Sequence, residues 1–234
     1  MKRSRPVIAI DGPVGAGKST VARRLAEVLG YEYVNTGAMY RAVVVAARAA
    51  GISAHVSDGD RDEVRETERK LDALLKTARI EFSDGRIMLD GRDVSAEIGS
   101  PEMSESASRL STLGVVRVRM RDLQRAAGER GGVVMEGRDI GTAVFPDAEC
   151  KFFLDASAEV RAERRWRELA ARGVQITCEK VLAQLHERDR RDRGRELAPL
   201  RPAPDAEVVD ASRMDIEQVV TLMAERIRAR GGAA

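Results

Sequence analysis

A glycine-rich segment near the amino terminus has the residue types and the spacing of a phosphate-binding loop (P-loop). Residues 12–20 read GPVGAGKST and match G-x-x-x-x-G-K-S/T between a predicted strand and a predicted helix. Glycines let backbone N–H groups point inward around phosphate oxygens, while Lys18 bridges the outer phosphates and Ser19 can bind Mg²⁺. The segment predicts a nucleoside triphosphate site at Gly12, Pro13, Val14, Gly15, Ala16, Gly17, Lys18, Ser19 and Thr20.

A P-loop does not by itself distinguish a kinase from a GTPase or a motor ATPase, so the acceptor must be inferred from other residues. Thr36 and Arg41 follow a predicted strand at residues 31–35. They place a hydroxyl and a guanidinium at the carboxyl edge of the sheet, where open α/β sheets bind ligands. On this segment alone, a helix-capping threonine and a solvated arginine explain the pattern equally well.

Three charged residues, Glu136, Arg138 and Asp139, follow another predicted strand at residues 132–135. They emerge at the sheet edge beside the P-loop, where an acid can hold the water shell of Mg²⁺. We therefore expect Glu136 to bind the metal together with Ser19. A structural salt bridge between Arg138 and a nearby acid is the alternative.

An arginine-rich stretch at residues 186–196 carries a second candidate group. Arg188, Asp192 and Arg195 are spaced i, i+4 and i+7, so a helix presents them as one stripe with the acid between two cations. Taken as a bare charge run, the same stretch is typical of a solvated helix with i, i+4 ion pairs.

Five short apolar runs, each followed by a stretch long enough for a helix, indicate the fold. They lie at residues 7–11, 31–35, 132–135, 150–154 and 207–209. This alternation favours an α/β fold with a five-stranded parallel sheet and helices on both faces. Between residues 52 and 113 the pattern changes, and turn signals at 83–85 and 90–91 separate three alternating runs. These runs predict a small inserted α+β subdomain with an antiparallel sheet.

Composition excludes several other classes of protein. The chain has 234 residues, 43% of them hydrophobic, which is enough for a sizeable core. The 40 lysines and arginines are balanced by 38 acids, so the formal net charge is only +2 and the chain is no polycation. No stretch approaches the roughly 20 apolar residues of a membrane span. The two cysteines lack metal-ligand spacing, and we expect a cytoplasmic protein. His55 and His186 show no partner pattern of a base or a metal ligand.

Four segments together are far more specific than the P-loop. GPVGAGKST, NTGAMYR, EGRDIGTAVFPDA and ERDRRDRGRELAPL occur in the same order as in bacterial cytidylate kinases, which the chain resembles nearly end to end. The resemblance implies the nucleoside monophosphate (NMP) kinase fold and phosphorylation of CMP and dCMP by ATP and Mg²⁺ in pyrimidine metabolism. It also implies a monomer that acts on small molecules, with no nucleic acid and no membrane as partner.

The resemblance divides the chain into functional regions. It implies a P-loop core at residues 1–51 and 114–234, with an NMP-binding subdomain at 52–113. A lid region at 158–195 is expected to close over the triphosphate. Its candidate arginines are Arg161, Arg164 and Arg165, of which we expect the last two to contact the nucleotide; spacing alone does not decide which of the three does.

The resemblance also assigns roles to the charged residues that follow the strands. Arg138 grips the CMP phosphate and Asp139 reads the base. Arg188 and Asp192 hold the sugar, and Arg195 works near the phosphates. Lys18, Arg138 and Arg195 are thus the expected catalytic residues. Many relatives carry Asp at the position of Glu136.

Two helix residues, Ser108 and Arg117, match positions that help such kinases to select cytosine. A hydroxyl and a guanidinium can together satisfy an edge with an amine, a ring nitrogen and a carbonyl. By spacing alone both are ordinary helix residues. We expect Thr36 and Arg41 to belong to the same substrate site.

Three alternatives remain open. A related kinase acting on UMP or AMP would share the P-loop half and would differ at Ser108, Arg117 and Asp139. A nucleic-acid-binding ATPase would use the arginines between 161 and 195 to follow a phosphate backbone, although interleaved acids and the lack of aromatic stacking positions argue against it. A nucleotide-sensing module without turnover is disfavoured by the intact Lys18, Ser19 and Glu136.

Overall fold

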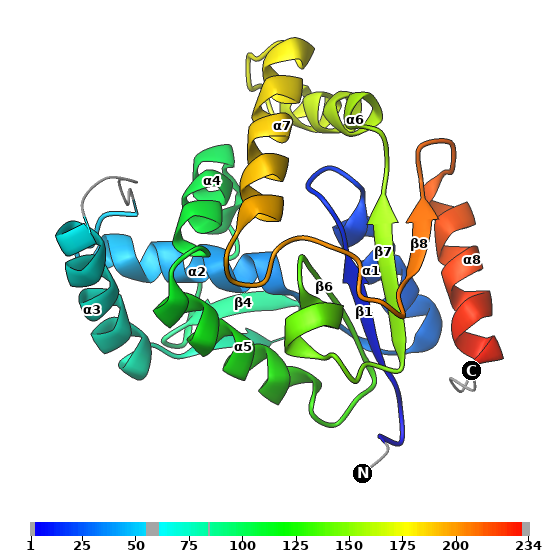
Figure 1. The fold of residues 1–234 in the computed structure, drawn as a ribbon, viewed down its shortest axis with the longest axis horizontal. Coiled ribbons are helices and arrows are strands. Elements are labelled where there is room, and N and C mark those ends of the chain that lie inside the picture. The colour runs from blue at the N-terminus through cyan, green and yellow to red at the C-terminus, as the bar shows by residue number, and fades with distance from the viewer. Residues whose placement is uncertain (1–2, 55–60, 84, 231–234) are drawn as a thin grey trace. The chain divides into compact units, whose positions relative to one another are not determined.

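The computed structural model describes residues 3–54, 61–83 and 85–230 (Figure 1). His55, part of the expected insertion and Asp84 of the expected 83–85 turn lie outside these residues. The elements in chain order are β1 (Val7–Asp11), α1 (Lys18–Leu29), β2 (Glu32–Asn35), α2 (Thr36–Ala49), α3 (Arg61–Thr77), β3 (Ile80–Ser83), β4 (Arg86–Leu89), β5 (Arg92–Asp93), η1 (Glu97–Gly99), α4 (Pro101–Leu110), α5 (Gly114–Gly128), β6 (Val133–Gly137), η2 (Ile140–Val144), β7 (Cys150–Asp155), α6 (Ala158–Ala171), α7 (Cys178–Gly194), β8 (Glu207–Asp210) and α8 (Ile216–Ala229).

Five strands form one sheet in the order β2-β6-β1-β7-β8. Strand β1 pairs in parallel with β6 and β7, and β7 pairs in parallel with β8. Every residue of β1 and β6 is buried, which explains why these strands are mostly continuous apolar runs without alternation. Parallel strands end at one edge, so the segments that follow β1, β6 and β7 are neighbours. The parallel α/β sheet expected from the sequence is confirmed.

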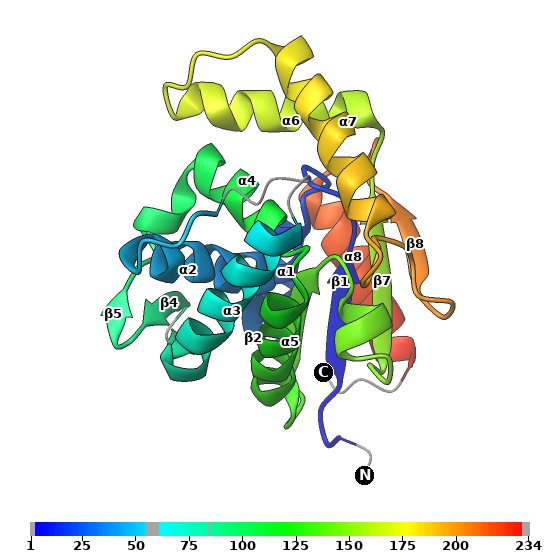
Figure 2. The ribbon, with the colours of Figure 1, turned by 60° about the vertical axis from the view of Figure 1, so that its left-hand side comes forward.

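Helices α1 and α8 pack against each other and cover one face of this sheet. Ile8 and Phe152 of the sheet are fully enclosed with Leu25 of α1 and Met223 of α8. At the carboxyl ends of the strands the chain forms the paired helices α6 and α7, toward which the arrow of β7 points (Figures 1 and 2). In the part of the chain that the structure describes, no helix is long and apolar enough to cross a membrane.

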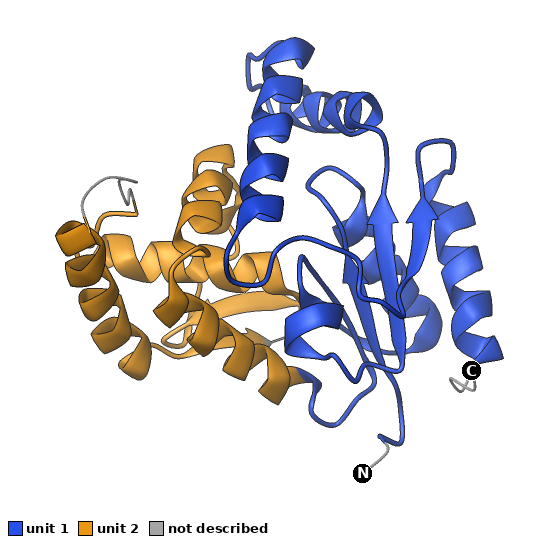
Figure 3. Ribbon diagram, in the orientation of Figure 1, with its two compact units in different colours: residues 1–33, 128–234 blue, residues 34–127 orange. Residues whose placement is uncertain are grey.

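The chain forms two compact units, residues 1–33 with 128–234, and residues 34–127 (Figure 3). The second unit contains the antiparallel sheet β3-β4-β5, as its turn signals predict. This unit is larger than the segment 52–113 that the resemblance assigns to NMP binding. The role of that segment stays a prediction.

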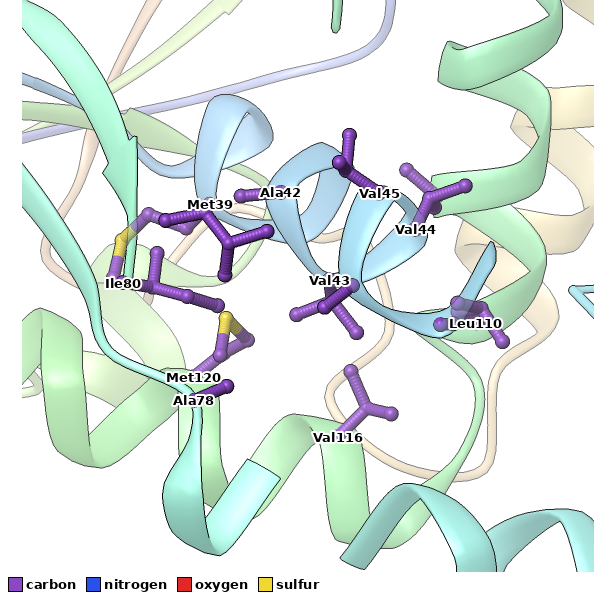
Figure 4. Close-up of a cluster of buried hydrophobic side chains, with 14 of the residues drawn as sticks. Met39, Ala42, Val43, Val44, Val45, Ala78, Ile80, Leu110, Val116 and Met120 are labelled. Atoms are coloured by element: carbon purple, nitrogen blue, oxygen red, sulfur yellow. The ribbon is translucent and has the colours of Figure 1, made fainter. Parts of the chain in front are cut away.

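The core of the second unit surrounds helix α2. Met39 and Val43 of this helix lie in one buried cluster with Leu110 of α4 and Met120 of α5 (Figure 4). Helices α2 and α5, which flank the expected insertion, therefore both contribute to the core of the second unit. The apolar character of α2, which has buried side chains along most of its length, follows from this position.

The passage from β1 into the P-loop is possible only for glycine at position 12. Gly12 has φ 150°, and a Cβ there would lie 2.0 Å from the carbonyl oxygen of Leu154 on β7. That distance is far below any van der Waals contact, and the obstacle is backbone rather than a flexible side chain. The first P-loop glycine is thus required by the packing of β1 against β7.

We predict that Gly12→Ala lowers the free energy of unfolding by about 3 kcal/mol or more, because it combines a strained φ with a backbone collision. Gly173→Ala is the matched control, since Gly173 has φ 76° but nothing within 4 Å of a new Cβ. It should cost only the left-handed strain, roughly 1–2 kcal/mol. Urea denaturation of both variants measures the difference, and equal losses would contradict the role of Leu154.

Candidate active site

The P-loop leads from the end of β1 into the first turn of α1. Gly15 and Gly17 have φ of 80° and 94°, and Gly17 is the N-cap of α1. Lys18 is buried, and its ammonium group donates a hydrogen bond of 2.7 Å to the Pro13 carbonyl oxygen across the loop. The predicted order of strand, glycine loop and helix is confirmed, and the positive end of α1 points into the loop.

Ser19 and Glu136, the predicted metal-binding pair, are in direct contact. The Ser19 hydroxyl donates to Oε1 of Glu136 at 2.7 Å, and the Tyr33 hydroxyl donates to the same oxygen at 3.4 Å. Glu136 is buried and lies within β6, whereas the sequence places it after the strand. Burial and the nearby Glu136 carboxylate raise the pKa of Tyr33, so its hydroxyl keeps its proton.

A hydroxyl and a carboxylate are the hard oxygen donors that Mg²⁺ prefers. This ion keeps most of its waters and typically binds through one or two protein groups together with substrate phosphates. Among residues 3–54, 61–83 and 85–230, no three His, Cys, Asp or Glu side chains are arranged to hold a metal. Ser19 and Glu136 therefore fit an ion that arrives with a nucleotide rather than one held by protein alone.

Lys18 is buried among charges of both signs, with Arg138 and Arg188 opposed by Glu136 and Asp11. Burial, followed by repulsion from Arg138, lowers the pKa of Lys18 to about 7; Arg188 acts in the same direction, and attraction to Glu136 opposes it. Cations that repel one another at short range are stabilised when an anion binds among them. The charges around the P-loop are thus arranged for a highly anionic ligand.

Asp192 on α7 is the shared partner of the predicted substrate-binding arginines. Its carboxylate is fully buried and accepts hydrogen bonds from Nε of Arg138 at 2.9 Å and from Nη2 of Arg195. The Nε atom of Arg188 lies 3.9 Å from its Oδ2. Burial would raise the pKa of Asp192, but attraction to the three arginines outweighs burial and lowers it. The structure therefore brings these four predicted residues together, although Arg195 follows the last residue of α7.

Asp139, the predicted base reader, is buried and precedes a π-helical turn, η2. The carboxylate of Asp11 holds the start of this turn by accepting hydrogen bonds from the backbone N–H groups of Ile140 at 2.8 Å and Gly141 at 2.7 Å. Burial raises the pKa of Asp11 to about 7, although these two N–H groups oppose the shift. Asp11 thus connects the strand before the P-loop to the backbone that carries Asp139.

The three candidate lid arginines on α6 have different surroundings. Arg161 is buried in the first turn of the helix. Arg164 donates to the carbonyl oxygen of Ala211 at 2.7 Å, and Arg165 pairs with Glu168 at 2.6 Å on an exposed face. Contact of Arg164 and Arg165 with a triphosphate stays a prediction.

Other arginines of α6 and α7 pair with acids on their own helix. Arg167 pairs with Glu163 on α6 and Arg191 with Glu187 on α7, both at i, i+4. Such pairs are typical of solvated helices and leave fewer cations for a phosphate backbone. This pairing argues against the nucleic-acid alternative.

Two predicted substrate residues, Thr36 and Arg41, lie on α2 in the second compact unit. Asn35, not Thr36, caps this helix, because its side chain accepts a hydrogen bond from the Ala38 N–H at 3.0 Å. Thr36 is the first helical residue and is buried. The Arg41 guanidinium turns back along the helix, with Nη1 3.5 Å from the point where a Cβ on Gly37 would lie.

The two residues expected to select cytosine, Ser108 and Arg117, lie near each other in the second unit. The carbonyl oxygen of the buried Ser108 accepts a hydrogen bond of 2.7 Å from the Ser111 hydroxyl. The carbonyl oxygen of Ser111 in turn accepts one of 3.2 Å from Nη1 of Arg117. Ser111 therefore links α4 to α5 between the two predicted residues. Their role in base selection stays a prediction.

Sequence reasoning missed Tyr33 and Asp11. The signal for Asp11 was present, because it is the one charged residue of an otherwise apolar buried strand and directly precedes Gly12. Tyr33 left no such signal, since an aromatic residue in a strand is ordinary. Only the pairing of strands brings it to Glu136.

The first strand of the parallel sheet leads through a P-loop into a helix. Ser19, Glu136 and the arginine cluster around Asp192 lie in the same compact unit. Together these features define a P-loop nucleotide kinase. The sequence matches the family model described as cytidylate kinase over residues 8–229. The chain belongs to the cytidylate kinase family.

Individual relatives agree with this assignment. The chain is 46% identical over 228 residues to a cytidylate kinase of Citrifermentans bemidjiense, covering 96% of this chain and 93% of that protein. It is 48% identical over 228 residues to a cytidylate kinase of Pelotomaculum thermopropionicum, covering 97% of each. A solved structure of an uncharacterized protein from Eubacterium ventriosum is similar in fold, with a TM-score of 0.50, 12% identity and coverage of 96% and 99%.

We predict that Asp192→Asn lowers the free energy of unfolding by about 3 kcal/mol, because it leaves clustered arginines without their buried anion. Glu163→Gln is the control, since Glu163 makes an exposed ion pair with Arg167 on α6. It should change stability by no more than about 1 kcal/mol. Denaturant unfolding of both variants at neutral pH measures the two losses, and similar small values would show that Asp192 does not hold the cluster.

Asp11 predicts a dependence of stability on pH. Between pH 3.8, its ordinary pKa, and about 7, its pKa in the folded protein, the folded state binds a proton that the unfolded state does not. The contribution of Asp11 to stability is therefore full below this window and is lost as pH rises through it, by up to ~4 kcal/mol. Asp11→Asn cannot titrate, so the stability advantage of the wild type over it should shrink from pH 4 to pH 7. A constant difference across unfolding curves in that range would contradict the shift.

Proposed function

We propose that the protein transfers the terminal phosphoryl group of ATP to CMP and dCMP, giving ADP together with CDP or dCDP. One observation supports this most directly: Asp192 gathers Arg138, Arg188 and Arg195 in the same compact unit as the P-loop. Two of these arginines are close enough to perturb Lys18. Membership of the cytidylate kinase family supports the choice of acceptor.

The proposed acceptor explains why the arginines matter more than a general base. A phosphate monoester has a second pKa near ~6 and is largely a dianion at neutral pH, so it can attack without a base. The enzyme must instead align two anionic substrates and neutralise their charge. In this proposal Lys18, Arg138 and Arg195 neutralise the phosphates, and Asp139 recognises the base.

Ser19 and Glu136 would hold the Mg²⁺ that accompanies ATP. The bound ion would screen the phosphate charge and orient the triphosphate. The Ser19–Glu136 hydrogen bond brings the two candidate ligand oxygens together, and Tyr33 donates to the same carboxylate oxygen. The longer side chain of Glu136, compared with Asp, is thereby anchored at one oxygen.

The proposal includes a lid made by α6 and α7, in the region 158–195, with Arg164 and Arg165 as candidate contacts of the triphosphate. A site that admits water would hydrolyse ATP, whereas a closed site transfers the phosphoryl group to the acceptor. Substrate selection in the second unit is assigned to Thr36, Arg41, Ser108 and Arg117. We also propose a monomer in the cytoplasm that acts in pyrimidine nucleotide metabolism.

The decisive experiment measures ADP formation from ATP and Mg²⁺ with CMP, dCMP, UMP, AMP, GMP or no acceptor, each at sub-saturating concentration. We expect rapid ADP formation with CMP and dCMP only, and slow hydrolysis of ATP alone. Lys18→Met is the control for contaminating kinases, and its turnover should fall on the order of 10²- to 10³-fold because a charged donor is lost.

Other outcomes would each redirect the proposal. Preference for another monophosphate would preserve the phosphotransferase and overturn the assignment of Ser108, Arg117 and Asp139 to cytosine. Equal ADP formation with and without acceptor would contradict a kinase. A mobility shift of single-stranded oligonucleotide that weakens with salt would then favour the nucleic-acid alternative.

A further inference from the structure

Arg161 on α6 is turned away from solvent and bonded to three different segments of the first compact unit. Its Nε donates to the Ala156 carbonyl oxygen at 3.0 Å, and its Nη1 donates to the Val14 carbonyl oxygen at 3.1 Å. Its Nη2 donates to Oδ2 of Asp189 on α7 at 2.6 Å. One guanidinium therefore joins the end of β7, the P-loop and the second predicted lid helix.

The contact with Val14 acts on the P-loop backbone. In a planar trans peptide the carbonyl oxygen and the following N–H point in opposite directions. When Arg161 binds the carbonyl of Val14, the N–H of Gly15 is therefore turned to the opposite side, away from α6. P-loops bind phosphate through such inward-pointing N–H groups. Arg161 thus restrains the rotation of the Val14–Gly15 peptide plane within the P-loop.

The first turn of α6 also packs directly on the loop. A Cβ on Gly15 would lie 3.1 Å from the carbonyl oxygen of Arg161 and 3.2 Å from its Cβ. The Val14 side chain packs on the small apolar cluster between α6 and α7 that contains Ala162 and Leu185. The base of the two lid helices and the P-loop therefore form one packed layer around the guanidinium.

Burial of Asp189, the carboxylate that pairs with Arg161, costs free energy. Asp189 is only 5% exposed, and its Oδ1 has no hydrogen-bond partner among the residues that the structure describes. Well-packed apolar side chains often replace a buried ion pair without loss of stability, so stability alone does not explain this pair. The ion pair instead holds the Arg161 guanidinium in a position from which it can reach the Val14 carbonyl.

We propose that Arg161 and Asp189 are a positioning pair that holds the Val14–Gly15 peptide in its phosphate-binding orientation and ties the lid base to the P-loop. Neither side chain needs to contact the nucleotide. The inference rests on the proposed function only in that the P-loop binds ATP. It does not depend on which monophosphate accepts the phosphoryl group.

The test compares binding of ATP with Mg²⁺, measured by calorimetry without acceptor, in the wild type and in the double variant Arg161→Met/Asp189→Leu. This variant replaces the Arg161–Asp189 pair with apolar side chains. It should remain folded, since Asp155, whose Oδ1 lies 4.0 Å from Nε of Arg161, is partly exposed to solvent. We expect its dissociation constant for ATP to rise on the order of tenfold or more. In steady state the KM for ATP should rise more than the KM for CMP. Arg167→Met, which breaks an exposed ion pair on the same helix, is the matched control and should bind ATP normally.

A folded double variant that binds ATP like the wild type would overturn the proposal. Arg161→Lys provides a second measurement if the double variant fails to fold. Lysine keeps the charge beside Asp189 but cannot reach Val14 and Ala156 at once, so ATP affinity should again fall. Unchanged ATP affinity in a folded Arg161→Lys protein would overturn the proposal equally. If ATP binding is lost as expected but CMP is not phosphorylated by the wild type, the proposed acceptor fails while the positioning pair stands.

Discussion

The structure of the first compact unit depends on one electrostatic constraint, which is that several cations must lie close together before any phosphate is present. Lys18 shows the cost, because burial and repulsion from Arg138 lower its pKa to about 7. The protein limits this repulsion with buried carboxylates. Asp192 receives hydrogen bonds from Arg138 and Arg195, and attraction to the arginines around it keeps its pKa low in spite of full burial.

Each carboxylate near the P-loop also orients a part of the site. Glu136 accepts a hydrogen bond of 2.7 Å from the Ser19 hydroxyl, and Asp11 accepts hydrogen bonds from the two backbone N–H groups that follow Asp139. Hydrogen bonds of this kind hold rotamers and peptide planes that a phosphate-binding site needs in advance. Asp192 therefore offsets the positive charge of the arginines, while Glu136 and Asp11 fix the geometry in which an incoming anion meets it; burial raises the pKa of Asp11 to about 7, so its main contribution is the position of the backbone.

Local patterns in the sequence predicted the individual strands, the P-loop and the antiparallel insertion, because each of these depends on residues near each other in the chain. They predicted the stripe of Arg188, Asp192 and Arg195 for the same reason. They did not predict that Arg138, which directly follows β6, joins this stripe on α7, because that contact spans 54 positions. Tyr33 was missed on the same ground, since strand pairing rather than spacing brings it to Glu136, whereas the position of Asp11 directly before Gly12 was a signal in the sequence.

The arginines of α6 show that helical spacing does not determine which side chains reach a ligand. Spacing places Arg161, Arg164 and Arg165 on one region of the helix, and all three read as candidate phosphate ligands. In the folded chain Arg161 instead binds the P-loop carbonyl of Val14 and the carboxylate of Asp189. Periodicity says which side chains share a face, but burial decides whether a guanidinium meets ligand or protein. Because Arg161 donates a hydrogen bond to the backbone of the P-loop, it can support triphosphate binding without contacting the triphosphate.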